Sequence, residues 1–151
     1  MSQSLSSVIL HTVFSTKGRR PWLQDRLVRQ ALHRYLGGIL LERNCPPLIV
    51  GGVEDHVHLL SEFSRTGSIA DLVKEVKRGS SAWLKTQGPS YADFAWQNGY
   101  GVFSLGFSQI DAARRYIEDQ ETHHHQTSFQ EEYRLLLEKY GARYDERHVW
   151  D

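Results

Sequence analysis

The chain has 151 residues, which suits one domain with a sizeable core, and its 40% apolar and 24% charged residues are an ordinary globular balance. The N-terminus has no basic region followed by an apolar run, and no apolar stretch approaches the roughly 20 residues of a membrane helix, so we predict neither a signal peptide nor membrane association. A single cysteine, Cys45, excludes an intrachain disulfide and favours a reducing compartment. We expect a cytoplasmic protein whose residues 1–151 form one domain.

The net charge is zero, whereas domains that bind nucleic acid are usually basic. The distribution is uneven. Residues 1–80 carry 11 Lys and Arg against 7 Asp and Glu, a net charge of +4, and residues 81–151 carry 7 against 11, a net charge of −4. A basic half could offer DNA a positive face, but the acidic residues could equally lie on solvated C-terminal helices.

The first half of the chain alternates strand and helix patterns. Residues 7–15 are rich in β-branched and apolar residues and predict a strand, which a basic loop at 17–21 follows. Apolar residues recur at helical spacing over residues 24–43, although Gly37-Gly38 weakens the pattern, and Pro46-Pro47 ends it.

The middle of the chain predicts a hairpin and a second long helix. Residues 48–53 and 56–63 are strand candidates on either side of a tight turn at Glu54-Asp55. Ser68 is a helix cap of the kind that precedes an apolar helical stripe, and that stripe continues to about Lys85.

The remaining residues predict one more strand and two helices. Residues 101–107 form the strand candidate, Ser108 or Asp111 caps a helix to about His123, and Ser128 caps a helix over about 128–141. The order β-α-β-β-α-β-α-α indicates an α+β fold, a ferredoxin-like split βαβ with a central antiparallel sheet and additional C-terminal helices. We expect a core over about residues 7–125, with two long helices on one sheet face and the other face left for function or for the C-terminal helices.

His56 and His58 form the first candidate site. Residues i and i+2 of a strand point to the same side, so both imidazoles project together while Val57 points into the core. Two imidazoles at this spacing can share a divalent cation, and a further oxygen donor would admit Mg²⁺ or Mn²⁺ with open positions for a phosphate. The alternative is a pair of structural strand histidines bonded to the backbone.

Tyr116 and Gln120 form the second candidate site. They are four residues apart in a predicted helix and so share a face, whereas Ala113 and Ile117 mark the buried face. A tyrosine can act as a covalent nucleophile, and the carbonyl oxygen of Gln120 could complete a metal site. Taken alone, Tyr116 could also be an ordinary surface tyrosine. His123, His124 and His125 could assist such a site or simply lie at a helix C-terminus.

Several segments, in this order and spacing, carry a resemblance to a known family. They are Leu10-His11-Thr12-Val13-Phe14-Ser15-Thr16-Lys17-Gly18-Arg19-Arg20, Val53-Glu54-Asp55-His56-Val57-His58-Leu59-Leu60, Val73-Lys74-Glu75-Val76-Lys77 and Tyr116-Ile117-Glu118-Asp119-Gln120, followed by His123-His124. From about Val8 to His125, the chain resembles the HUH-type single-tyrosine transposases of small bacterial insertion sequences and the related REP-associated tyrosine transposases.

The resemblance implies a ferredoxin-like homodimer that cuts and rejoins single-stranded DNA with Mg²⁺ or Mn²⁺. It assigns metal binding to His56, His58 and Gln120, and it makes Tyr116 the nucleophile that forms a 5′-phosphotyrosine link. It also implies that hairpins near the element ends are recognised, and that one subunit's tyrosine helix can complete its partner's histidine site. The family often has asparagine before the glutamine, so Asp119 adds a negative charge there.

Basic and aromatic residues outside these motifs are candidates for DNA contacts. We expect backbone phosphate contacts from Lys17, Arg19, Arg20, Lys74, Lys77 and Arg78. Tyr91, Phe94, Trp96 and Tyr100 could stack unpaired bases or could simply pack in the core.

Three other functions remain open from the sequence. A replication initiator or plasmid relaxase uses similar residues, but such chains usually carry further domains. A domesticated protein could bind DNA hairpins without cutting them. A metal-dependent, phosphatase-like hydrolase would not need Tyr116.

Overall fold

A four-stranded antiparallel sheet with strand order β2-β3-β1-β4 forms the centre of the computed structural model, which describes residues 2–123 and 127–151. The strands are β1 (Ile9–Ser15), β2 (Pro47–Gly52), β3 (His56–Glu62) and β4 (Gly101–Leu105). Each neighbouring pair runs antiparallel. The predicted ferredoxin-like α+β fold is therefore confirmed.

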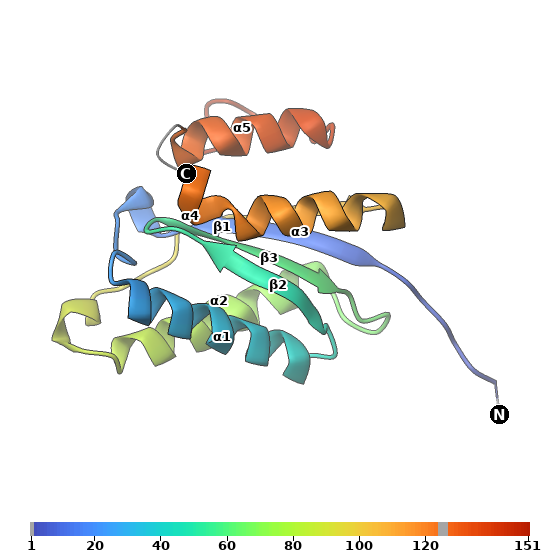
Figure 1. The fold of residues 1–151 in the computed structure, drawn as a ribbon, viewed down its shortest axis with the longest axis horizontal. Coiled ribbons are helices and arrows are strands. Elements are labelled where there is room, and N and C mark those ends of the chain that lie inside the picture. Colours follow the sequence, from blue (N-terminus) through green and yellow to red (C-terminus); the bar gives the residue numbers. More distant parts are fainter. Residues whose placement is uncertain (1, 124–126) are drawn as a thin grey trace.

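Helices cover both faces of the sheet (Figure 1). One face carries α1 (Arg26–Glu42) and α2 (Ile69–Lys85), and the other carries α3 (Ile110–Glu118), α4 (Gln120–His123) and α5 (Phe129–Lys139). Strand alternation divides the side chains between these layers. Phe14 packs in the same cluster as α1 and α2, whereas its neighbour Val13 packs against α5.

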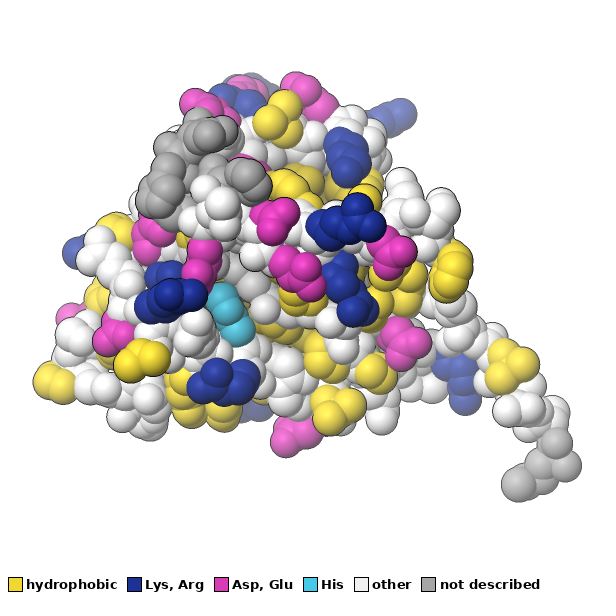
Figure 2. All heavy atoms as spheres, viewed as in Figure 1, with side chains coloured by type: hydrophobic (Ala, Val, Ile, Leu, Met, Phe, Trp, Pro, Cys, Tyr) yellow, Lys and Arg dark blue, Asp and Glu magenta, His cyan; other side chains and the backbone are white. Residues whose placement is uncertain are grey.

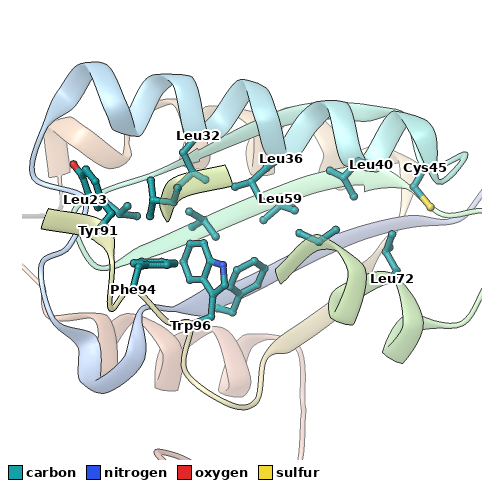
Figure 3. Packing of buried hydrophobic residues seen from close by; sticks show 14 residues of the cluster. Leu23, Leu32, Leu36, Leu40, Cys45, Leu59, Leu72, Tyr91, Phe94 and Trp96 are labelled. Atoms are coloured by element: carbon teal, nitrogen blue, oxygen red, sulfur yellow. The ribbon is translucent and has the colours of Figure 1, made fainter. Parts of the chain in front are cut away.

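The main core lies between the sheet and the two long helices. Leu32, Leu36 and Leu40 recur at helical spacing on α1 and are fully buried. Figure 3 shows them pointing toward Leu59 of β3. This packing holds one face of the sheet against α1 and α2, and the other face is covered by α3 and α5.

Side-chain caps define where the helices begin. Asp25 accepts hydrogen bonds from the backbone N–H groups of Leu27 and Val28, so α1 begins at Arg26, two residues later than predicted. Ser68 and Ser128 cap α2 and α5 as the sequence predicted.

The helix predicted to run unbroken to about His123 is instead divided. Asp119 has φ −87° and ψ 3°, so α3 ends at Glu118 and α4 begins at Gln120. Neither Ser108 nor Asp111 caps α3, because Gln109 occupies the cap position and its side chain makes no capping hydrogen bond. β4 also ends at Leu105, since Phe107–Gln109 form a short 3-10 helix.

The base-stacking alternative is wrong for three of the four aromatic residues proposed for it. Tyr91, Phe94 and Trp96 are buried in the main core, and the Trp96 indole donates a 3.0 Å hydrogen bond to Ser80 Oγ. Tyr100 alone among the four is exposed, at 40% of its surface. Core packing therefore explains the aromatic segment at 89–99.

Candidate active site

The two histidines of β3 lie side by side on the sheet face covered by α3 and α5. His56 and His58 are both buried, and their ring centroids are 5.0 Å apart. Val57, between them, is buried in the core on the opposite face. The sequence predicted this division from the strand period of two.

Each histidine is oriented by a hydrogen bond at Nδ1. His56 Nδ1 is 2.7 Å from Asp55 Oδ1, and His58 Nδ1 is 2.8 Å from His11 Nε2. Such bonds fix the orientation of an imidazole ring and leave the other nitrogen for a ligand. The Nε2 atoms of both rings consequently face the same space.

Two oxygen donors share that space with the Nε2 atoms. His56 Nε2 lies 3.1 Å from Gln120 Oε1 and 3.4 Å from Glu132 Oε1, and His58 Nε2 lies 2.6 Å from Glu132 Oε1. His58 Nε2 and Glu132 Oε1 are buried but lack the alignment of a hydrogen bond. Two nitrogens and two oxygens directed at one point, with two of these atoms unsatisfied, fit a divalent cation.

Burial and mutual contacts shift the pKa values of these residues. Burial acts to lower the pKa of His56, but its contacts with Asp55 and Glu132 outweigh burial and raise the pKa to about 9. Burial dominates at His58 and lowers its pKa. Burial acts to raise the pKa of Glu132, but the two histidines outweigh it and hold the pKa below its ordinary range. Glu132 is therefore a buried anion.

Tyr116 lies beside this group in the same chain. Its ring centroid is 5.6 Å from that of His58, and 39% of its surface is exposed. Burial, followed by the charge of Glu132, raises the pKa of the Tyr116 phenol above its ordinary value. The ring opens into a cavity of about 450 Å³ between α3 and α5, lined also by His11, Gln120, Glu132, Leu136, Lys139 and Tyr140.

Tyr116 and Gln120 both line the cavity even though the helix between them breaks at Asp119. Ala113 and Ile117 are buried beneath them, as predicted. A Cβ atom at Gly51 of β2 would stand 2.7 Å from Ile117 Cγ2 and 3.0 Å from the Ile117 carbonyl oxygen. The absence of a side chain at Gly51 thus lets α3 approach the sheet closely.

The first group of predicted DNA contacts lies near the histidines. Thr16 N donates a 2.9 Å hydrogen bond to Asp55 O, which places the loop of Lys17, Arg19 and Arg20 beside the turn that precedes His56. Lys17 and Arg20 are exposed, and the Arg19 guanidinium lies 5.9 Å from the Trp150 ring centroid.

The second group lies on α2, across the sheet from the histidines. Lys77 Nζ donates hydrogen bonds to the carbonyl oxygens of Gln97 (2.8 Å) and Gly99 (2.6 Å), and Arg78 pairs with Glu75. Lys74 is exposed. The structure therefore does not bring Lys74, Lys77 and Arg78 to Tyr116. The face that Figure 2 shows also carries interspersed acidic and basic side chains rather than one basic patch.

Three residues of the site were missed by reasoning from the sequence alone. His11 and Asp55 appeared only as members of longer motifs, although an Asp directly before a strand histidine is a signal for an orienting partner. Glu132 carried no local signal, since its role depends on how α5 docks. His124 and His125 lie outside the described residues, and His123 is described only as the last residue of α4.

A family model described as transposase IS200 like matches residues 4–120. The match covers most of the chain and includes both histidines, Tyr116 and Gln120. The chain belongs to this family. This transposase therefore carries its buried histidine pair, tyrosine and glutamine within the family region, whereas Glu132 lies beyond it.

Two solved structures share the fold of this transposase. A candidate transposase from Deinococcus radiodurans is 23% identical, with a TM-score of 0.60, over 80% of this chain and 98% of its own. A REP-associated tyrosine transposase bound to a REP hairpin is 13% identical, with a TM-score of 0.60, over 82% of this chain and 74% of its own. A comparison with curated protein sequences found no match. No helix among the described residues is long and apolar enough to cross a membrane.

Proposed function

We propose that this transposase cuts and rejoins single-stranded DNA by attack of Tyr116 on a phosphodiester. The observation that carries the proposal is that two residues of the cavity wall, Tyr116 and Gln120, lie beside the buried His58 and His56 within one chain. A tyrosine with an ordinary structural role would need no buried histidine pair beside it.

His56, His58 and Gln120 would hold the divalent cation, Mg²⁺ or Mn²⁺, through two nitrogens and one amide oxygen. When bound, the ion would polarise the scissile phosphate and offset its developing negative charge. Asp55 and His11 hold the imidazoles by their Nδ1 atoms, so the Nε2 atoms need no reorientation when the ion arrives.

Cleavage exchanges one phosphoester bond for another, so the number of these bonds does not change. Tyr116 Oη attacks the scissile phosphorus, the bond to the 3′-oxygen breaks, and that oxygen takes up a proton while the phenol loses one. The 5′-phosphate remains on Tyr116 as a phosphotyrosine. A second 3′-hydroxyl can then attack the same phosphorus, which joins the strands, releases the phenol and requires no ATP.

DNA contacts follow from the position of the basic loop beside the site. Lys17, Arg19 and Arg20 would bind backbone phosphates near the scissile bond. Lys74, Lys77 and Arg78 would contact only DNA that wraps to the other face of the sheet. The solved relative bound to a REP hairpin supports a structured single strand as the substrate.

The homodimer, the cytoplasmic location and the single domain over residues 1–151 remain predictions. A partner subunit is not required to bring the tyrosine to the histidines, because both belong to one chain here. We therefore propose an active site completed within each subunit, whatever the oligomeric state.

The substitution Tyr116→Phe tests the proposal. Wild type incubated with Mn²⁺ and a hairpin-containing single strand should form a covalent adduct that survives a denaturing gel, and Tyr116→Phe should form none while it retains hairpin binding. A persistent adduct in the variant would rule out Tyr116 as nucleophile. Hairpin binding without any adduct in wild type would favour a domesticated binding protein.

A further inference from the structure

Glu132 reaches the histidine pair from outside the region that the family model matches. It lies on α5, which begins at Phe129, whereas the match ends at residue 120. Phe129, Leu136 and Leu137 dock α5 against Val13 of β1 and Phe103 of β4. This docking turns Glu132 toward the sheet, where it is buried.

The spacing around Glu132 is that of ligand atoms around one ion. Adjacent ligands of an octahedral Mg²⁺ or Mn²⁺ bound at about 2.1 Å stand about 3 Å apart. Glu132 Oε1 is 2.6 Å from His58 Nε2 and 3.4 Å from His56 Nε2, and Gln120 Oε1 is 3.1 Å from His56 Nε2. His56, His58 and Glu132 each have a ligand atom within 4.8 Å of the others.

We propose that Glu132 is a fourth protein ligand of the divalent cation, beside His56, His58 and Gln120. The inference rests on the metal site of the proposed function and extends it to a helix outside the family match. The resulting set of two imidazoles, one amide and one carboxylate would leave room at the ion for a phosphate oxygen and a water.

Charge and hydrogen bonding support this assignment. Neutral imidazoles and an amide would leave both positive charges of the ion uncompensated in a buried site, whereas a carboxylate offsets one of them and is a preferred ligand of Mg²⁺ and Mn²⁺. Glu132 Oε1 and His58 Nε2 are both buried without a hydrogen bond. A shared cation would satisfy both atoms.

The assignment has a consequence for the substrate cavity. Leu136 and Lys139 of α5, and Tyr140 directly after it, line the cavity into which Tyr116 opens. An ion bound by Glu132 would tie α5 to β3 and α4 and so fix the wall of this cavity. Metal binding should therefore slow amide hydrogen exchange in α5 of the wild type.

Mn²⁺ titration of the full chain without DNA, followed by calorimetry, tests the assignment. Glu132→Ala should weaken Mn²⁺ binding by about 10- to 100-fold or more, since loss of even an outer partner has an effect of this size. Glu132→Gln keeps the volume and one oxygen donor and should lose less affinity. Glu131→Ala is the matched control, because Glu131 is the neighbouring acid on α5 and is exposed.

Two results would overturn the proposal. Unchanged Mn²⁺ affinity in Glu132→Ala would show that Glu132 is no ligand, and tighter binding would show that its carboxylate instead competes with the ion. Circular dichroism in EDTA identifies any variant that fails to fold. If Glu132→Ala does not fold, the Mn²⁺ affinity of Glu132→Gln tests the assignment instead. Adduct formation by wild type is measured separately, so failure of this assignment is distinguishable from failure of the tyrosine mechanism.

Discussion

At the scale of single residues, the orienting bond from Asp55 to His56 has a measurable effect. The 2.7 Å bond between Asp55 Oδ1 and His56 Nδ1 fixes the imidazole and increases its basicity as a ligand. We predict that Asp55→Ala weakens Mn²⁺ binding by about 10- to 100-fold in a calorimetric titration. Asp55→Asn retains an acceptor oxygen and should lose less. Wild-type affinity in Asp55→Ala would contradict this role.

The residues of the site differ in the sequence signal by which each could be predicted. His56 and His58 could be predicted as neighbours because the strand period places i and i+2 on one side. Tyr116 and Gln120 were recognised by their spacing together with the family resemblance. Glu132 could not be predicted as a site residue, because an acidic residue on a C-terminal helix is usually exposed to solvent. Only the docking of α5 buries it.

At the scale of elements, the close approach of α3 to β2 positions Tyr116. We predict that Gly51→Ala destabilises the protein by about 1–3 kcal/mol, as overpacked sites do, and lowers the rate of adduct formation, because Ile117 and the helix that carries Tyr116 must move. Chemical denaturation and denaturing gels measure the two effects.

A matched control for this substitution is available on α1. A Cβ atom at Gly38 would meet no atom within 4 Å, so Gly38→Ala should leave adduct formation unchanged and gain up to about 1 kcal/mol of stability from helix propensity. If Gly51→Ala equals wild type in stability and rate, the contact between β2 and α3 does not position the tyrosine.

Most elements could be predicted because their signals are local. β-Branched and apolar composition identified the first strand, a tight turn between two such runs identified the hairpin, and Ser68 and Ser128 were predicted as caps that the structure confirms. The break at Asp119 could not be predicted, since neither glycine nor proline marks it. The sequence also left open whether the second face of the sheet would be left for function or covered by the C-terminal helices, because that depends on tertiary packing.

At the scale of the whole molecule, stability should depend on pH through His33. Burial, followed by the charge of Arg29, lowers the pKa of His33 to about 4. The pKa of His33 in the folded protein is below its unfolded value of about 6.5. The contribution of neutral His33 to stability is therefore fully present above pH 6.5 and is lost as the pH falls toward 4. Because His33 is only half-buried, its share of the loss between pH 7 and pH 5 is at most about 2 kcal/mol.

The variant His33→Gln isolates this contribution in metal-free buffer. Urea denaturation at pH 7 and pH 5 should show a smaller loss of stability in His33→Gln than in wild type. The comparison is needed because other groups titrate over the same range; His11, whose pKa burial lowers to about 3, acts in the same direction. An equal loss of stability between pH 7 and pH 5 in both proteins would show that the pKa of His33 is the same in the folded and unfolded states.

The identity of the residue that becomes linked to DNA tests the central claim most directly. Trypsin cleaves after Arg115 and Arg134, so the peptide from Tyr116 to Arg134 contains two tyrosines, Tyr116 and Tyr133. After reaction with Mn²⁺ and a hairpin-containing single strand, fragmentation of this peptide by mass spectrometry should place the nucleotide phosphate on Tyr116. A phosphate on Tyr133, on Tyr140 in the peptide from Tyr140 to Arg143, or on no tyrosine would contradict Tyr116 as the nucleophile.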